Sequence, residues 1–125
     1  LGLLNTNAFT AADSVLIPVQ CEYYALEGLT QLLSTIRLIQ RLFNRKLVIE
    51  GVLLTMFDAR TNLSLEVQQE VRKYFKESTY KTHIPRSIKL SEAPSRGQTI
   101  YEYDIKSTGA KAYAALAKEV IKNNE

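Results

Sequence analysis

Two apolar segments of this chain end abruptly in polar loops, and no other feature constrains its fold as strongly. The first segment, residues 52–54, leads into residues 55–62, which carry Asp58, Arg60 and Asn62, and the second ends at Ile84 and leads into residues 85–94. In open α/β sheets, ligands bind just beyond the carboxyl ends of the strands. We therefore expect a binding site in these two loops.

Strand-like and helix-like segments alternate along the chain. Residues 26–43 repeat apolar side chains every three or four positions, as an amphipathic helix does, whereas residues 47–56 are apolar almost throughout, as in a strand covered on both faces. In chain order the segments indicate the tail of a helix (1–12), a strand (15–19), a helix (26–43), a strand (47–56), a helix capped by Asn62, a strand (80–84), a loop with one short helix (85–106) and a final helix capped by Ser107 or Thr108. This alternation predicts parallel strands joined by right-handed crossovers.

The predicted sheet is small, because a doubly wound domain usually has about five strands or more. We therefore interpret residues 1–125 as the C-terminal half of a larger α/β domain, with a doubly wound, mainly parallel sheet and flanking helices. The chain contains no glycine-rich phosphate loop, although its strand ends have the character of a ligand site. The site therefore resembles one half of a larger one.

Composition restricts the setting of the protein. A single cysteine, Cys21, excludes an intramolecular disulfide and favours a reducing, cytoplasmic compartment. No apolar run approaches the ~20 residues that a membrane helix needs, so we expect no membrane contact. The net charge of +3 permits contact with nucleic acid but does not require it.

Several segments resemble the ParA/Soj family of chromosome- and plasmid-partitioning ATPases. They are residues 11–20, 22–28, 55–62, 84–86 and 90–94. The resemblance implies a P-loop NTPase that binds ATP with Mg²⁺, dimerises as a nucleotide sandwich and binds nucleoid DNA without sequence preference. It also implies a ParB-type centromere-binding partner that stimulates hydrolysis. The family's phosphate loop and catalytic aspartate would lie upstream of Leu1, so we expect no ATP turnover by residues 1–125 alone.

The resemblance assigns roles to the two loops. Thr55, Met56, Pro85 and Arg86 correspond to the strand ends that form the family's adenine pocket. A base needs flat apolar walls and one or two hydrogen bonds to its edge, which these residues can supply. The alternative is that the same residues merely close the core and stop a strand.

Arg60 and Lys89 match basic residues that bind DNA in the family. Cations on loop tips bind phosphates without reading bases, which suits sequence-independent binding. Lys89 stands where close relatives are expected to carry arginine, and lysine keeps the charge but lacks the bidentate fork. Exposed loop cations with no ligand are the alternative for both.

A third group of residues is a candidate dimer or partner surface. Its members are Gln20, Glu22, Tyr23 and Tyr24. Tyrosine favours interfaces because it combines an apolar ring with a polar tip. The alternative is that one tyrosine packs inward while the other lies on the surface.

The remaining reactive side chains are expected to have structural roles. Asp58 suits a turn in which its carboxylate accepts a backbone N–H nearby. His83 and Cys21 have no chemical partner close in sequence, so a packed histidine and an inert thiol are favoured. We assign no catalytic residue and no metal ligand.

Three alternative functions remain open. A MinD-like ATPase that positions the division site should end in a basic amphipathic helix with bulky apolar residues, whereas this chain has alanines at 114, 115 and 117. A non-enzymatic α/β interaction module is the second alternative, and a regulator of another process that uses the same ATPase, such as capsule synthesis or plasmid copy control, is the third. The sequence does not identify the cargo, which could be a chromosome, a plasmid or a protein cluster.

Overall fold

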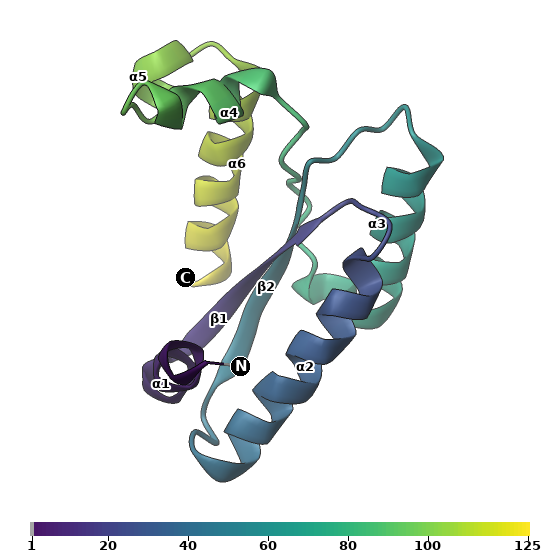
Figure 1. The fold of residues 1–125 in the computed structure, drawn as a ribbon, viewed down its shortest axis with the longest axis vertical. Coiled ribbons are helices and arrows are strands. Elements are labelled where there is room, and N and C mark those ends of the chain that lie inside the picture. The colour runs from purple at the N-terminus through teal and green to yellow at the C-terminus, as the bar shows by residue number, and fades with distance from the viewer. Residues whose placement is uncertain (1) are drawn as a thin grey trace.

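The computed structural model of the chain describes residues 2–125 and has the α/β architecture expected from the sequence (Figure 1). In chain order its elements are α1 (Leu3–Ala11), β1 (Ser14–Gln20), α2 (Ala25–Leu42), β2 (Val48–Thr55), α3 (Asn62–Phe75), the 3₁₀ helix η1 (Lys76–Ser78), α4 (Ile88–Ser95), α5 (Ile100–Asp104) and α6 (Thr108–Asn123). β1 and β2 pair in parallel, so the predicted crossover through α2 is confirmed. The N-terminal helix is confirmed as well.

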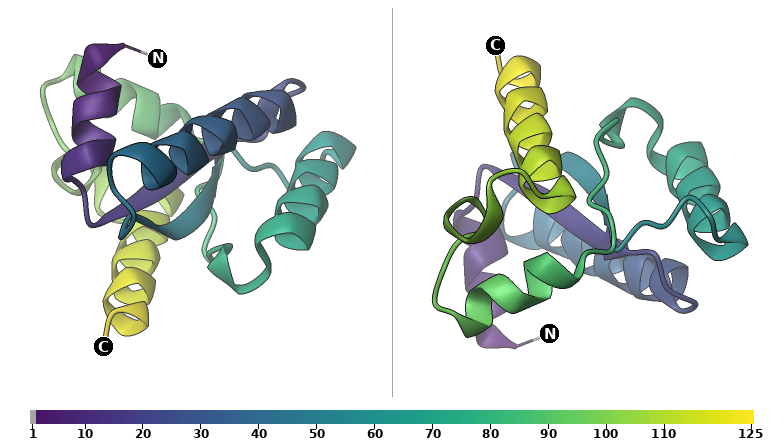
Figure 2. Two further views of the ribbon diagram at one scale, coloured as in Figure 1. Left: turned by 90° about the horizontal axis from the view of Figure 1, so that it is seen from below. Right: turned by 90° about the horizontal axis from the view of Figure 1, so that it is seen from above.

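The two strands lie between α2 and α3 on one side and α6 on the other (Figures 1 and 2). Val52 and Leu54 of β2 belong to the larger buried cluster, which includes Ile36 of α2. Leu53, between them, belongs to a second cluster that includes residues of α6. Successive side chains of a strand point to opposite faces, so β2 is covered on both sides, as its continuous apolarity predicted.

The predicted third strand is wrong, because residues 80–84 bulge away from β2. Tyr80 donates its backbone N–H to the Val52 carbonyl at 3.0 Å, and Ile84 donates to the Leu54 carbonyl at 2.8 Å. The two acceptors are two residues apart and the two donors four apart, so the segment holds two residues more than a regular parallel ladder needs. We call residues 80–84 the bulged segment.

Glu119 of α6 binds the backbone that the ladder leaves out. Its carboxylate accepts the amide of Lys81 at 2.8 Å and the amide of Thr82 at 2.9 Å. These two amides have no strand carbonyl as a partner in the ladder, and here a side chain takes the place of that carbonyl. A glutamate 37 residues further along the chain gives no local sign of this role.

The segment after the bulge contains two helices, α4 and α5, where the sequence predicted one short helix. Thr99 and Glu102 form a reciprocal capping box at the start of α5. Ser107 caps α6 as predicted, accepting the Ala110 amide at 3.1 Å. Thr61 caps α3 in place of the predicted Asn62, because the Thr61 hydroxyl accepts the Ser64 amide at 3.2 Å.

Candidate functional site

Both predicted loops lie at the carboxyl edge of the sheet, where β1 and β2 end together (Figure 1). Directly after β2, Met56 turns the chain with a φ of 52°, in the left-handed region that non-glycine residues rarely adopt. Phe57 then donates its amide to the Ile84 carbonyl at 3.0 Å, and its own carbonyl accepts the Arg86 amide at 3.1 Å. These bonds fasten the loop after β2 to the loop after the bulged segment.

Thr55, Met56, Pro85 and Arg86 line one pocket of about 440 Å³, which we call the strand-end pocket. The structure thus brings the four candidate adenine-binding residues together, although what the pocket binds stays a prediction. Its other lining residues are Ile84, Ser87, Ile88, Leu90, Ser91 and Tyr113. Apolar walls with a few hydroxyl groups suit a flat heteroaromatic ring.

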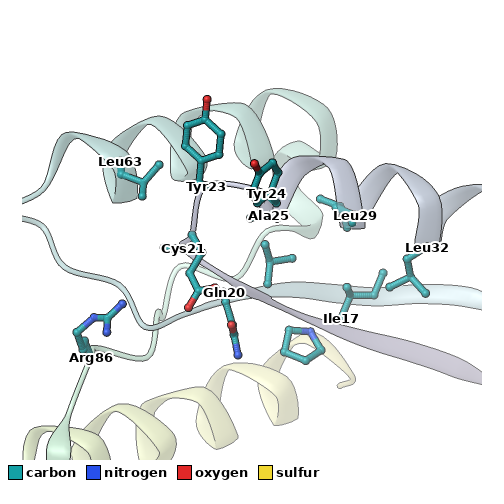
Figure 3. A pocket seen from close by; sticks show the side chains of 14 residues that line it. Ile17, Gln20, Cys21, Tyr23, Tyr24, Ala25, Leu29, Leu32, Leu63 and Arg86 are labelled. Carbon is teal, nitrogen blue, oxygen red and sulfur yellow. The ribbon is translucent and has the colours of Figure 1, made fainter.

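Gln20, Glu22, Tyr23 and Tyr24 line a second pocket of about 670 Å³ at the end of β1 (Figure 3). Tyr23 is 79% exposed and Tyr24 is 72% exposed, so the alternative in which one tyrosine packs inward is wrong. Their rings meet edge to face, with centroids 5.0 Å apart. We call this the tyrosine pocket.

Arg86 joins the two pockets, because it lines both of them. Figure 3 shows its side chain extending from the loop toward the end of β1, near Gln20 and Cys21. A cation between two cavities can contact a ligand in either one. The sequence assigned Arg86 to the adenine pocket.

Arg60 lies on the loop after β2 and its side chain is 90% exposed. Asp58 accepts the Arg60 backbone amide at 3.0 Å and also pairs with its guanidinium at 3.0 and 2.9 Å. These bonds lower the pKa of Asp58 to about 2. The geometry confirms the turn predicted at Asp58, and it also gives Arg60 a carboxylate partner.

Lys89 lies in the first turn of α4 and is paired with Asp104 of α5. The hydrogen bond to Asp104 raises the pKa of Lys89, so this lysine is fully charged at neutral pH. Both candidate DNA-binding cations therefore have carboxylate partners. A phosphate ligand has to compete with Asp58 and Asp104, and exposed ion pairs of this kind are weak.

His83 is packed against another side chain, as predicted, and Cys21 is buried. Burial raises the pKa of the Cys21 thiol. The His83 ring packs on Phe57, with centroids 4.0 Å apart, and burial lowers the pKa of the imidazole. Among residues 2–125, no group of three or more His, Cys, Asp or Glu side chains could hold a metal ion. No helix in this part of the chain is long and apolar enough to cross a membrane.

Sequence reasoning missed two contributions from α6. Tyr113 is 37% exposed and lines the strand-end pocket. Glu119 was not considered at all, although it holds the bulged segment that leads into Pro85. Both contributions depend on how α6 packs against the sheet, which no local pattern encodes.

Comparisons with known proteins show which proteins this chain resembles. A family model described as an AAA domain matches residues 1–49. The sporulation initiation inhibitor protein Soj of Bacillus subtilis is 64% identical over 98% of this chain and 49% of its own length. The chromosome partitioning protein ParA of Myxococcus xanthus is 55% identical over 99% of this chain and 44% of its own length. The chain thus spans about half the length of the curated relatives it matches.

A solved structure shares the fold. Cobyrinic acid a,c-diamide synthase from Mycobacterium smegmatis, crystallised with an ATP analogue and magnesium, superposes with a TM-score of 0.77 at 31% identity. The match covers 99% of this chain and 45% of that protein. The neighbour supports the α/β architecture of this chain. Because partitioning proteins match almost the entire chain at up to 64% identity, the chain belongs to the ParA/Soj-type family of partitioning ATPases.

Proposed function

We propose that this chain supplies the adenine pocket and the DNA-binding loops of an ATP-dependent DNA-partitioning ATPase. The observation that carries the proposal is the meeting of Thr55, Met56, Pro85 and Arg86 in one pocket at the carboxyl edge of a parallel sheet. In such sheets this edge is the usual ligand site. Arg60 lies in the loop that follows β2 at this edge, and Lys89 lies in α4, which follows the loop after the bulged segment.

The strand-end pocket suits adenine better than a charged ligand. Met56, Pro85 and Tyr113 offer apolar surfaces for the two faces of a purine ring. The Thr55 hydroxyl and the neighbouring backbone can hydrogen-bond the edge of the base. The triphosphate and Mg²⁺ would be bound by residues outside this pocket, because the described residues include no phosphate loop.

DNA binding would use Arg60 and Lys89 together. Each cation can exchange its carboxylate partner for a backbone phosphate, which adds the release of counterions from the DNA. Such contacts do not read bases, so the resulting binding is independent of sequence.

The tyrosine pocket is the candidate contact for a second subunit in an ATP-bound dimer, or for a ParB-type partner. The exposed pair of Tyr23 and Tyr24 supports this role, because large exposed aromatic rings favour interfaces. Because Arg86 lines both pockets, nucleotide binding in the strand-end pocket would change the position of a side chain that also lines the tyrosine pocket.

A chimaera tests the base pocket. Residues 1–125 replace the matching half of Bacillus subtilis Soj, which is 64% identical, so that an upstream half is present. Thr55→Ala is expected to weaken ATP binding roughly 3- to 10-fold, because one hydrogen bond to the base is lost. The dissociation constant is measured by calorimetry or with a fluorescent ATP.

Thr30→Ala is the matched control, because Thr30 lies exposed on α2 and only bonds the backbone of its own helix. It should leave ATP binding unchanged. Equal ATP affinities for Thr55→Ala and the unmutated chimaera would contradict a base contact at Thr55.

A further inference from the structure

Glu119 makes a bidentate contact with the backbone of the bulged segment. Its two carboxylate oxygens accept the consecutive amides of Lys81 and Thr82, at 2.8 and 2.9 Å. Burial tends to raise the pKa of Glu119, but these hydrogen bonds outweigh it, and the pKa lies below the ordinary value. The carboxylate is therefore ionised at neutral pH, and charge-assisted bonds to backbone amides are the stronger kind.

The contact lies between two fixed points of the chain. On one side, the Tyr80 ring is buried against Gly51, where an added Cβ would lie 2.4 Å from the ring. On the other side, Ile84 pairs with both Leu54 and Phe57 of the central strand and its loop. Only the backbone between these points is free of the ladder, and Glu119 holds two of its amides.

The bulge decides which residues reach the strand-end pocket. A regular parallel ladder would place the Thr82 amide, rather than the Ile84 amide, opposite the Leu54 carbonyl. Pro85 and Arg86 would then move about two residues along the edge, and different side chains would line the pocket. The two additional residues of the bulged segment thus determine which side chains line the strand-end pocket.

We propose that Glu119 is a positioning residue for base recognition. By holding the amides of Lys81 and Thr82, it keeps Pro85 and Arg86 in register with Thr55 and Met56 across the strand-end pocket. Tyr113 lines the same pocket from the same helix, so α6 shapes the site both directly and through the bulged segment. This inference rests on the proposed function, since it specifies how the adenine site is built.

The test uses Glu119→Gln in the chimaera with Bacillus subtilis Soj. Glutamine has nearly the same size, but its NH₂ group cannot accept an amide hydrogen, so one of the two bonds is lost. Glu66→Gln is the matched control, because Glu66 is exposed on α3 and the same charge is removed. Three ligands are compared by competition: ATP, GTP and inorganic triphosphate, which has no base.

Glu119→Gln is expected to weaken ATP binding on the order of 10-fold and to reduce the preference for ATP over GTP. Binding of inorganic triphosphate should not change, because its contacts lie outside the strand-end pocket. Hydrogen exchange at the amides of Lys81 and Thr82 should become faster than in the Glu66→Gln control. A purely structural role would instead affect all three ligands together with the urea midpoint.

The outcomes separate this inference from the proposed function. An unmutated chimaera that binds ATP no more tightly than inorganic triphosphate would refute the adenine pocket itself. An intact preference for ATP in Glu119→Gln, at unchanged affinity, would overturn the positioning role while the adenine pocket stands. Equal losses for ATP and inorganic triphosphate would also overturn it.

Discussion

Replacing Arg60 and Lys89 together by alanine in the chimaera is expected to weaken binding to non-specific duplex DNA about 100-fold at low salt. Hydrogen bonds to charged groups contribute about 1.5 kcal/mol or more each, and the loss of two corresponds to ~3 kcal/mol. Because each cation neutralises one phosphate, the salt dependence of the affinity should also fall by about one unit of slope per cation. Fluorescence anisotropy with a labelled duplex, in the presence of ATP, measures both quantities.

A second variant should shift DNA binding in the opposite direction. Asp104→Asn removes the charge that pairs with Lys89 but keeps an oxygen for the Lys106 amide, which bonds Asp104 at 3.1 Å. Because exposed ion pairs are worth about 1 kcal/mol or less, the gain in DNA affinity should be roughly two- to five-fold. ATP binding should be unchanged in both variants. DNA binding that survives the double change with the same salt slope would reject the assignment of Arg60 and Lys89.

The second large effect concerns stability. Gly51 of β2 faces the buried Tyr80 ring, and an added Cβ would lie 2.4 Å from two of its carbon atoms. Tyr80 is only 3% exposed, so the ring has no space into which it can move. Overpacking of this kind costs about 1–3 kcal/mol. Gly51→Ala should therefore lower the free energy of unfolding of the 125-residue chain by about this amount, measured by urea denaturation.

Tyr80→Phe is the matched control for this contact. The Tyr80 hydroxyl is buried and has no hydrogen-bond partner among residues 2–125, so removing it should leave stability unchanged or raise it slightly. A smaller residue at position 80 should relieve the clash, so Gly51→Ala combined with Tyr80→Val should cost less than the sum of the two single changes. Full additivity would mean that Gly51 and Tyr80 do not contact each other.

Local patterns in the sequence were sufficient for most of the fold. The 3.6-residue period of α2 and the continuous apolarity of β2 each encode their own structure, because both reflect which faces are buried. The bulged segment could not be predicted in this way. Its residues have the composition of a strand, but Gly51, Tyr80 and Glu119 decide its path through contacts between distant elements.

The same distinction between local patterns and contacts of distant elements applies to the residues of the candidate site. Thr55, Met56, Pro85 and Arg86 could be chosen from the sequence, because they follow apolar segments and match the motifs of a known family. Tyr113 could not, because its place in the pocket depends on the packing of α6. The carboxylate partners of Arg60 and Lys89 differ in the same way: Asp58 is two residues away, whereas Asp104 is fifteen residues away.

The proposed function depends on a purine-binding pocket at the ends of β2 and the bulged segment. Photoaffinity labelling of the chimaera with 8-azido-ATP, followed by mass spectrometry of the labelled peptides, tests it most directly. The expected label lies on peptides that contain Met56, Pro85 or Tyr113, and excess ATP should remove it. Labelling confined to peptides of the tyrosine pocket, or labelling that excess ATP does not reduce, would contradict the account.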